Sequence, residues 1–225
     1  ENRNQNRPIM EITHKGDKVI DLTPSIKQKA LRINLNDDIY GTFAEIGAGQ
    51  ETVRQFFRAG GASGTIAKAM SAYDKDFSDA IYGEEEDGRY VTEDRLKKML
   101  DHEMDLIEKR LSRKKHPNKL FFTYANTVTT IDFAKQYKGH GWVGIRFQID
   151  TTQVYNDIIL HIRFKETDAR LQQETLGTLG TNLIYGAFYK YNEPKSLLKY
   201  LYDHLNQDQL EIDTVNFSGP VFENV

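Results

Sequence analysis

Two apolar segments in the middle of the chain carry histidine and arginine at alternating positions. Residues 142–149 and 157–165 each alternate apolar with polar side chains, the pattern of β-strands buried on one face. Joined as a hairpin with both apolar faces in one core, they would present their basic side chains on the opposite face: Arg146, His161 and Arg163, with His140 just beyond. Such a group of guanidinium and imidazole side chains suits phosphate or carboxylate. We therefore predict a ligand site on this hairpin, with His140 or His161 as general acid or base.

Trp142 and Gly144 lie on the same predicted face as the basic side chains. A glycine within a strand often marks the close approach of another group, which favours a functional surface. We include Trp142 among the candidate ligand-binding residues. The competing interpretation is a solvated outer face of the sheet, and the sequence leaves both interpretations open.

Two glycine-rich stretches flank one short predicted helix, residues 50–59. The first stretch, residues 45–49, resembles the opening motif of methyltransferases, in which glycines let the backbone approach a nucleoside. It also begins like the dinucleotide fingerprint G-x-G-x-x-G, but Thr52 occupies the place of the last glycine. No alternating strands and helices precede it, so we predict a tight turn that leads into the helix. Gly47 and Gly49 are kept as candidate ligand-binding positions.

The second stretch, residues 60–65, has the composition of a phosphate-binding loop. Its glycines expose backbone N–H groups, Ser63 and Thr65 add hydroxyl donors, and Lys68 adds positive charge. The P-loop pattern G-x-x-x-x-G-K-[ST] is absent. We predict an anion-binding loop formed by Ser63, Gly64, Thr65 and Lys68, with a flexible loop after a helix as the alternative.

Two acidic residues complete the candidate site. Glu45 lies at the first glycine-rich stretch and Asp74 follows the second, and we assign both to catalysis as partners of a metal ion or a ribose. Mg²⁺ is the cofactor that a bound nucleotide would bring, and the sequence names no other. The chain has no cysteine, which excludes disulfides, thiolate metal sites and cysteine nucleophiles.

The helices and strands that must position these residues can be read from the sequence pattern. They predict an α+β fold with a mixed or antiparallel sheet packed by several helices. Turn and capping residues bound each apolar segment, and residues 65–73 are ambiguous between helix and strand. The predicted strands are residues 120–128, 142–149, 157–165 and 210–217. A shorter apolar piece spans residues 43–46. The predicted helices are residues 24–33, begun by Thr23, and residues 50–59, 92–114, 168–185 and 192–205.

Composition narrows the classes of partner. The 225 residues carry a net charge of −3, which provides no broad field for nucleic acid or an acidic membrane. No apolar run approaches the roughly 20 residues of a membrane helix. We expect a soluble, cytoplasmic chain with a flexible tail over residues 1–22 and a single α+β domain over residues 23–225.

Several segments together resemble an uncharacterised bacterial family often labelled nicotinate-nucleotide adenylyltransferase, and sometimes TonB-dependent receptor. The resemblance covers roughly residues 35–225. Its segments are FAEIGAGQE at 43–51, GTIAK at 64–68, SAYD at 71–74, SDAIYG at 78–83, HGW at 140–142, LQQE at 171–174 and NLIYGAF at 182–188. Members of that family continue beyond the position of Val225, so the resemblance implies the N-terminal part of a longer protein.

The resemblance implies chemistry on a nucleotide or another phosphorylated small molecule. Adenylyltransferases carry [HT]-x-G-H and S-x-T-x-x-R motifs, of which residues 137–140 keep Gly-His and residues 63–68 have lysine in place of arginine. The two motifs also occur here in reversed order, so whether the chain is an enzyme stays open, and nucleotidyl transfer rests on the label alone. A 22-stranded receptor barrel does not fit a sequence with this many helices. The alternative is a non-catalytic interaction or scaffold domain that contacts a missing C-terminal half or a second copy of itself.

Overall fold

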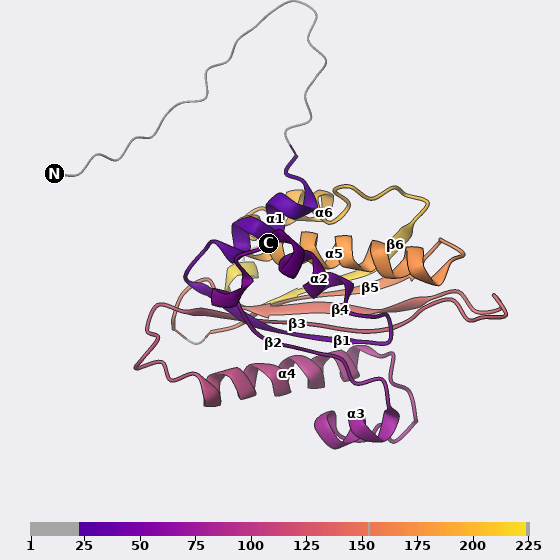
Figure 1. Cartoon of the computed structure of the whole chain (residues 1–225), viewed down its shortest axis with the longest axis horizontal. Helices are drawn as coiled ribbons and strands as arrows, with labels where there is room; N and C mark the ends of the chain where they lie inside the picture. Colours follow the sequence, from indigo (N-terminus) through magenta and orange to yellow (C-terminus); the bar gives the residue numbers. More distant parts are fainter. Residues whose placement is uncertain (1–22, 153, 224–225) are drawn as a thin grey trace, which may run out of the picture.

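A six-stranded mixed sheet forms the centre of the molecule (Figure 1). The computed structural model describes residues 23–152 and 154–223, so the predicted tail at 1–22 lies outside the described residues. The strand order is β2-β1-β3-β4-β5-β6. The strands are β1 (Ile39–Ile46), β2 (Ile66–Met70), β3 (Leu120–Thr129), β4 (His140–Phe147), β5 (Asn156–Phe164) and β6 (Leu210–Ser218).

The sheet changes from parallel to antiparallel at β3. β1 pairs in parallel with β2 and β3, whereas each neighbouring pair from β3 to β6 is antiparallel. The predicted hairpin of residues 142–149 and 157–165 is confirmed as β4 and β5. The fold class predicted from the sequence, α+β with a mixed sheet, is confirmed.

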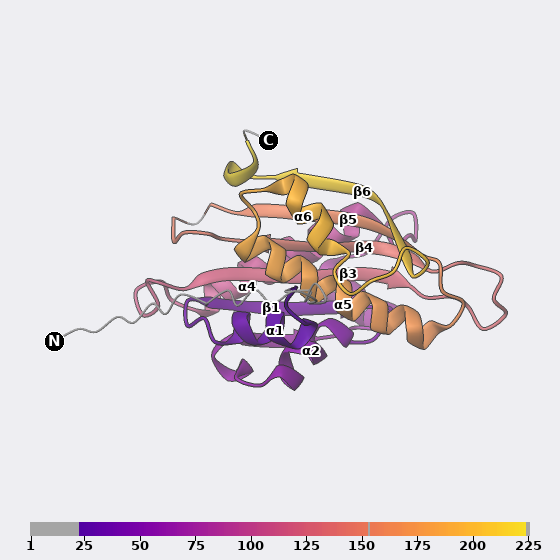
Figure 2. The ribbon, with the colours of Figure 1, turned by 90° about the horizontal axis from the view of Figure 1, so that it is seen from above.

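Helices cover both faces of the sheet, as Figures 1 and 2 show. One layer holds α1 (Ile26–Asn34), α2 (Glu51–Ala59), α5 (Ala169–Tyr189) and α6 (Pro194–Leu201). The other face carries α4 (Glu93–Arg110), with α3 (Lys75–Tyr82) beside it. Two short 3₁₀ turns, Ala62–Gly64 and Pro220–Phe222, complete the described elements. None of the helices in the described part of the chain has the length and apolar character needed to cross a lipid bilayer.

The alternation of side chains along β4 explains how one strand serves both layers. Val143 and Ile145 are fully buried in the large core beneath α1, α2, α5 and α6. Gly144 points to the other face, where a Cβ would lie 2.9 Å from Leu96 Cδ2 of α4. The close approach expected at this glycine is therefore that of α4, whose apolar stripe rests on the strand.

The N-terminus of the first helix differs from the prediction. We expected Thr23 to begin the helix, but α1 starts at Ile26, and Ser25 caps it. Ser25 Oγ accepts from Gln28 N at 3.2 Å while Gln28 Oε1 accepts from Ser25 N at 2.8 Å, a reciprocal capping box. The box satisfies two backbone donors at once, which explains why the cap lies two residues further along the chain.

The strands at one edge were only partly predicted. The apolar piece at residues 43–46 is the end of the longer β1, since Gly41 does not interrupt the strand but makes room for Phe122, whose ring lies 2.3 Å from where a Cβ would sit. The ambiguous residues 65–73 contain β2, and α3 was not predicted. The fourth predicted helix extends to Tyr189, and the long helix expected to reach residue 114 ends at Arg110.

Gly180 of α5 provides a direct test of this packing. A Cβ there would lie 2.3 Å from Thr52 Oγ1 and 2.5 Å from Tyr124 Oη. Gly180→Ala should lower the free energy of unfolding by roughly 1–3 kcal/mol, because α5 must move away from α2 and β3. Urea denaturation measures this, with Gly64→Ala as the control, since nothing lies within 4 Å of a Cβ at Gly64. Equal stabilities of the two variants would contradict the packing.

Candidate functional site

The histidines of β4 and β5 form a hydrogen-bonded chain with an aspartate of β6. His140 Nδ1 lies 3.2 Å from His161 Nε2, and His161 Nδ1 lies 2.6 Å from Asp213 Oδ1. In the β4–β5 register Trp142 pairs with His161, and Arg163 pairs with His140, so the two imidazoles are diagonal neighbours on one face. Three adjacent strands therefore contribute to one polar cluster.

Asp213 reaches this face because β6 contains a β-bulge. His161 pairs with Thr214 and Ile162 pairs with Ile212, which leaves Asp213 as an extra residue between the two pairs. A bulge re-aims side chains that a regular pleat would direct to the other face. Thr214 Oγ1 donates to Asp213 Oδ1 at 3.2 Å and holds the carboxylate in place. The sequence analysis missed Asp213, because a regular strand would have placed it opposite the core-facing Ile162.

The direction of the hydrogen bonds identifies the nitrogen that can accept a proton. An ionised Asp213 only accepts, so His161 donates from Nδ1 and, when neutral, presents Nε2 as an acceptor. His140 then donates from Nδ1 to His161, which leaves His140 Nε2 with a lone pair. Among the described residues no hydrogen bond engages this Nε2. The hydrogen-bonded series can thus take up a proton at His140 Nε2, and Asp213 stabilises the resulting positive charge through His161.

The electrostatics of the cluster favour this arrangement. The pKa of His140 lies below its ordinary value of 6.5, first because the ring is partly buried and then because His161 and Arg163 add positive charge nearby. Burial alone would raise the pKa of Asp213, but hydrogen bonds from His161 and Arg163 outweigh it and lower the pKa overall. At neutral pH the cluster therefore holds a carboxylate and an uncharged His140.

Arg163 and Trp142 flank the two histidines. Arg163 Nε lies 2.6 Å from Asp213 Oδ2, while its side chain is 61% exposed and its two terminal nitrogens form no hydrogen bond within the described residues. The ring centroid of Trp142 lies 4.8 Å from that of His161, at an interplanar angle of 48°. A basic nitrogen, a guanidinium and an indole ring therefore meet on one open part of the sheet.

This part of the sheet is open because α4 ends beside it. α4 packs against β1, β3 and β4, and its first turn reaches β6 through Glu93 Oε1, which accepts from Asn216 Nδ2 at 3.3 Å. The loop before α4 lies close to Trp142, because Tyr90 O accepts from Thr127 Oγ1 at 2.6 Å and Thr127 pairs with Trp142. The cluster thus lies past the N-terminal end of α4.

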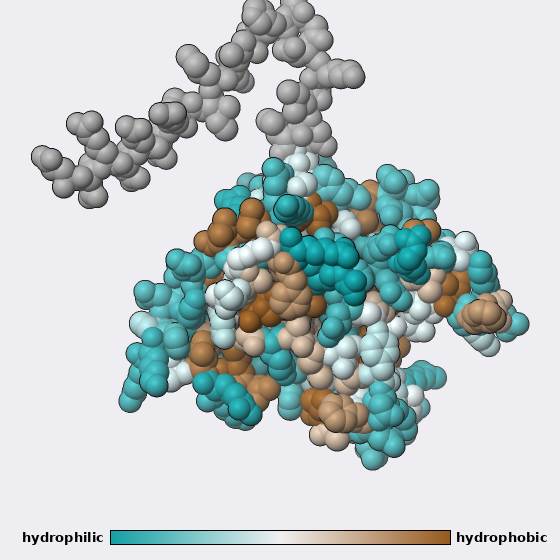
Figure 3. All heavy atoms as spheres, in the orientation of Figure 1, coloured by the Kyte–Doolittle hydropathy of each residue, from teal (hydrophilic) through white to brown (hydrophobic). Residues whose placement is uncertain are grey.

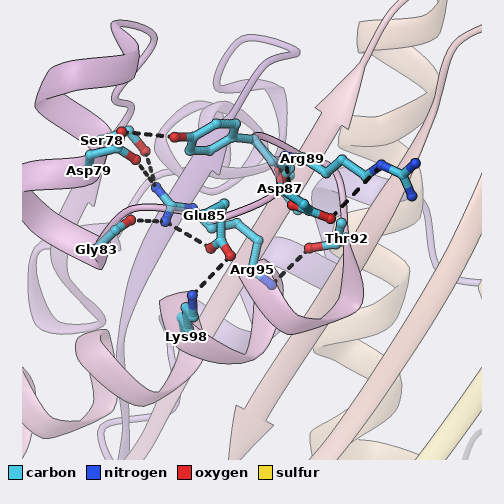
Figure 4. A network of polar contacts seen from close by, with 11 residues as sticks. Ser78, Asp79, Gly83, Glu85, Asp87, Arg89, Thr92, Arg95 and Lys98 are labelled. Atoms are coloured by element: carbon cyan, nitrogen blue, oxygen red, sulfur yellow. Dashed lines mark hydrogen bonds and ion pairs between the residues drawn. The ribbon is translucent and has the colours of Figure 1, made fainter.

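A buried arginine fixes that loop (Figure 4). Arg95 is 1% exposed, and Nη2 donates to Ser78 Oγ at 2.7 Å, while Nη1 donates to Gly83 O at 2.5 Å and to Glu85 Oε1 at 3.1 Å. Asp79 Oδ1 lies 3.6 Å from the same guanidinium. These contacts join α3, the loop and α4 into one unit beside the histidine cluster.

Arg146 does not take part in the cluster, although it shares the face. Its Nε and Nη2 each lie 2.8 Å from a carboxylate oxygen of Asp157, and Nη1 donates to Asp101 of α4. The paired carboxylates raise its pKa above the ordinary range of arginine. Arg146 therefore anchors α4 to the hairpin.

The glycine-rich segments are placed on both sides of the sheet. Thr65 Oγ1 donates to Asn34 O at 3.1 Å on the α1 side, whereas Lys68 Nζ lies 2.5 Å from Glu103 Oε2 on the α4 side. Ser63 and Gly64 belong to the exposed 3₁₀ turn that precedes Thr65. The structure therefore does not bring Lys68 together with the hydroxyls expected to share its anion.

Gly47 and Gly49 form the tight turn that leads into α2. Both have positive φ, at 96° and 72°, and a Cβ at Gly47 would lie 1.8 Å from Val128 O. Gly49 N donates to Tyr73 Oη. The backbone here is engaged within the protein, and the turn lies against β3 at Val128, where β1 leads into α2.

Glu45 is fully buried at the end of β1, under the first turn of α2. Its two carboxylate oxygens accept from Thr52 N at 3.1 Å and Val53 N at 2.8 Å, and Asn126 Nδ2 lies 3.4 Å from Oε2. Burial raises the pKa of Glu45 from 4.5 to about 7, although these hydrogen bonds act in the opposite direction. Its carboxylate caps a helix, a position that anions favour.

Asp74 caps a helix as well. Its Oδ1 accepts from Phe77 N at 2.8 Å at the start of α3. Within residues 23–152 and 154–223 no group of three or more histidine, aspartate and glutamate side chains converges to hold a metal ion.

Comparisons with known proteins add little to this geometry. No family model matches the chain, and no curated protein matches it. A competence-damaged protein (CinA) superfamily protein from Enterobacter cloacae aligns at a TM-score of 0.49 and 10% identity, over 80% of this chain and 99% of that one. The competence/damage inducible protein CihA from Agrobacterium tumefaciens aligns at a TM-score of 0.45 and 14% identity, over 73% and 97%. Likenesses this low establish neither a shared family nor a shared activity.

The histidine chain predicts pKa changes of opposite sign in two variants. His161→Ala should raise the pKa of His140, because it opens the partly buried ring to water and burial is the largest cause that lowers this pKa. Asp213→Asn should lower the pKa of His140 further, because it removes the one nearby charge that favours the imidazolium. Titration of the His140 imidazole by NMR measures both, and shifts of the same sign would show that the chain does not form.

The buried Glu45 predicts a dependence of stability on pH. Its folded pKa is raised, so the folded state binds the proton more tightly and wild-type stability falls as pH rises from 4.5 through about 7. At about 1.4 kcal/mol per pKa unit, the wild type should lose roughly 3 kcal/mol relative to Glu45→Gln between pH 4 and pH 8. Denaturant unfolding of both proteins at several pH values measures this difference. A constant difference would mean that folding leaves the pKa of Glu45 unchanged, and a difference of the opposite sign would mean that the α2 hydrogen bonds lower it.

Proposed function

We propose that the chain binds a nucleotide, or a similar phosphorylated molecule with an aromatic ring, at the cluster formed by His140, Trp142, His161, Arg163 and Asp213. The observation that supports this most is the hydrogen-bonded order Asp213–His161–His140, which ends in a free imidazole nitrogen. Chains of this kind hold one imidazole tautomer in place for proton transfer. The proposal rests on the site alone and not on a relative.

Each residue of the cluster has a separate role in this proposal. The terminal nitrogens of Arg163 bind phosphate oxygens, while Nε stays bonded to Asp213. The half-buried Trp142 ring contacts the aromatic part of the ligand. His140 then lies next to the phosphate, where its Nε2 is the nearest basic atom of the cluster.

The chemistry supported by this arrangement is general base catalysis. A hydroxyl group or a water molecule gives its proton to His140 Nε2 and becomes the nucleophile, and the imidazolium keeps its Nδ1 hydrogen bond to His161. Asp213 stabilises that positive charge through His161, and its carboxylate remains ionised because its pKa is lowered. The same imidazolium can return the proton to a leaving group.

A thermal-shift panel with nicotinate mononucleotide, ATP and NAD, each with and without Mg²⁺, tests the proposal. A ligand at 100 times its dissociation constant should stabilise the protein by about 2.7 kcal/mol. Arg163→Ala should weaken binding by about tenfold or more, because a charge-assisted hydrogen bond to phosphate is lost. Arg54→Ala is the matched control, because Arg54 is a similarly exposed arginine that α2 places on the opposite side of the sheet.

Either of two outcomes would contradict the proposal. One is the absence of a shift with any nucleotide, and the other is an equal loss of binding in both arginine variants. The remaining alternative is then an interaction domain. The exposed aromatic side chains of Tyr73 and Phe77 favour it, because such side chains commonly contact a partner protein. Each of these side chains, on and next to α3, is 62% exposed.

A further inference from the structure

A cavity lies under the opposite edge of the sheet from the histidine cluster. It has a volume of about 360 Å³, opens to solvent and is bounded by β1, β2 and the C-terminal half of α4. Its lining residues are Tyr40, Thr42, Ala67, Lys68, Leu106, Ile107, Arg110 and Leu111. The histidine cluster lies on β4, β5 and β6 past the other end of α4, so the two sites share no residue.

The walls of this cavity are apolar on the helix side. Leu106 and Leu111 are half-buried, and Ile107 is buried with Phe121 beneath it. Hydrophobic surface also interrupts the hydrophilic surface at the lower left of Figure 3, where Figure 1 shows the end of α4. A cavity of this size, with an apolar wall on the helix side and polar groups on the strand side and at the rim, has the character of a small-molecule site.

Of the two cations that line the cavity, Lys68 is paired with an acid and Arg110 is not. Lys68 Nζ lies 2.5 Å from Glu103 Oε2, and Glu103 is fully buried, so this pair is internally neutral. Arg110 is exposed at the rim and forms no ion pair with any of the described residues. Lys119 adds positive charge close to Tyr40, with Nζ 5.6 Å from the ring centroid. A ligand with one negative charge would therefore complement the rim.

We propose that this cavity binds a small amphipathic acid, with its aliphatic chain against Leu106, Ile107 and Leu111 and its carboxylate on Arg110. The hydroxyl groups of Tyr40 and Thr42 lie on the strand side of the cavity and can contact the head group. Burial of apolar surface holds the aliphatic chain of the ligand. The contact between its carboxylate and Arg110 selects an acid over a neutral molecule of the same shape. The proposal is independent of the nucleotide site.

The test uses octanoate as the probe and the full chain in ¹H–¹⁵N NMR titrations. Octanoate should shift amide signals of α4, β1 and β2 in a saturable way, and octanol and octylamine should bind about tenfold more weakly or not at all. Arg110→Gln should weaken octanoate by about tenfold and leave octanol unchanged. Lys109→Ala is the matched control, because Lys109 neighbours Arg110 but is not part of the lining.

Binding of octanoate and octanol to the wild-type protein can by itself overturn the proposal. Octanoate that shifts no signal of these elements, or octanol that binds as tightly as octanoate, shows that the cavity does not select an acid. Equal losses in Arg110→Gln and Lys109→Ala also contradict it, since they indicate nonspecific attraction to a basic helix end. Leu106→Gln should weaken octanoate and octanol together, which separates the apolar wall from the charged rim.

Discussion

Buried Glu45 holds together the edge of the sheet and the helix that follows it. Its carboxylate accepts two backbone N–H groups of α2 and contacts Asn126 of β3. Its backbone carbonyl oxygen, near the end of β1, accepts from Ser71 Oγ at 2.5 Å. Four segments of the chain therefore meet at one residue. Because an unpaired polar group is costly in the interior, each segment depends on the others for its hydrogen bonds.

The position of the candidate site follows from how the helices cover the sheet. Four helices cover one face, whereas α4 alone lies across β1, β3 and β4 on the other. Polar residues of β4 and β5 under α4, such as Arg146, must then pair with α4 and Asp157. Residues beyond its end, such as His140 and Arg163, are free to meet solvent. The same alternating pattern thus produces an anchor in one place and a candidate site in the other.

Local patterns in the sequence predicted most of the architecture. The hairpin, the long helix and the α+β class follow from periodicity, because side chains alternate in strands and recur every three to four residues in helices. The shared face of His161 and Arg163 followed in the same way. The sequence could not show that Arg146 would be occupied by Asp157 and Asp101, because those partners depend on where α4 crosses the sheet.

The residues that were not predicted depend on long-range contacts. Glu45 looked like a catalytic acid beside a glycine turn, and only the fold reveals that α2 donates two backbone hydrogen bonds to it. Lys68 looked like part of a phosphate loop, but the alternation of β2 turns it toward Glu103 and away from Thr65. Whether these residues also contact a ligand stays a prediction.

The bulge at Asp213 makes the cluster sensitive to the length of the chain as well as to its composition. One residue fewer between Ile212 and Thr214 would restore a regular ladder and leave His161 without its carboxylate, while the core contacts of β6 would stay in register. A deletion at this single position would therefore separate the chemistry of the cluster from the stability of the sheet. In distant relatives, a gap in an alignment at this position would be as informative as a substitution of either histidine.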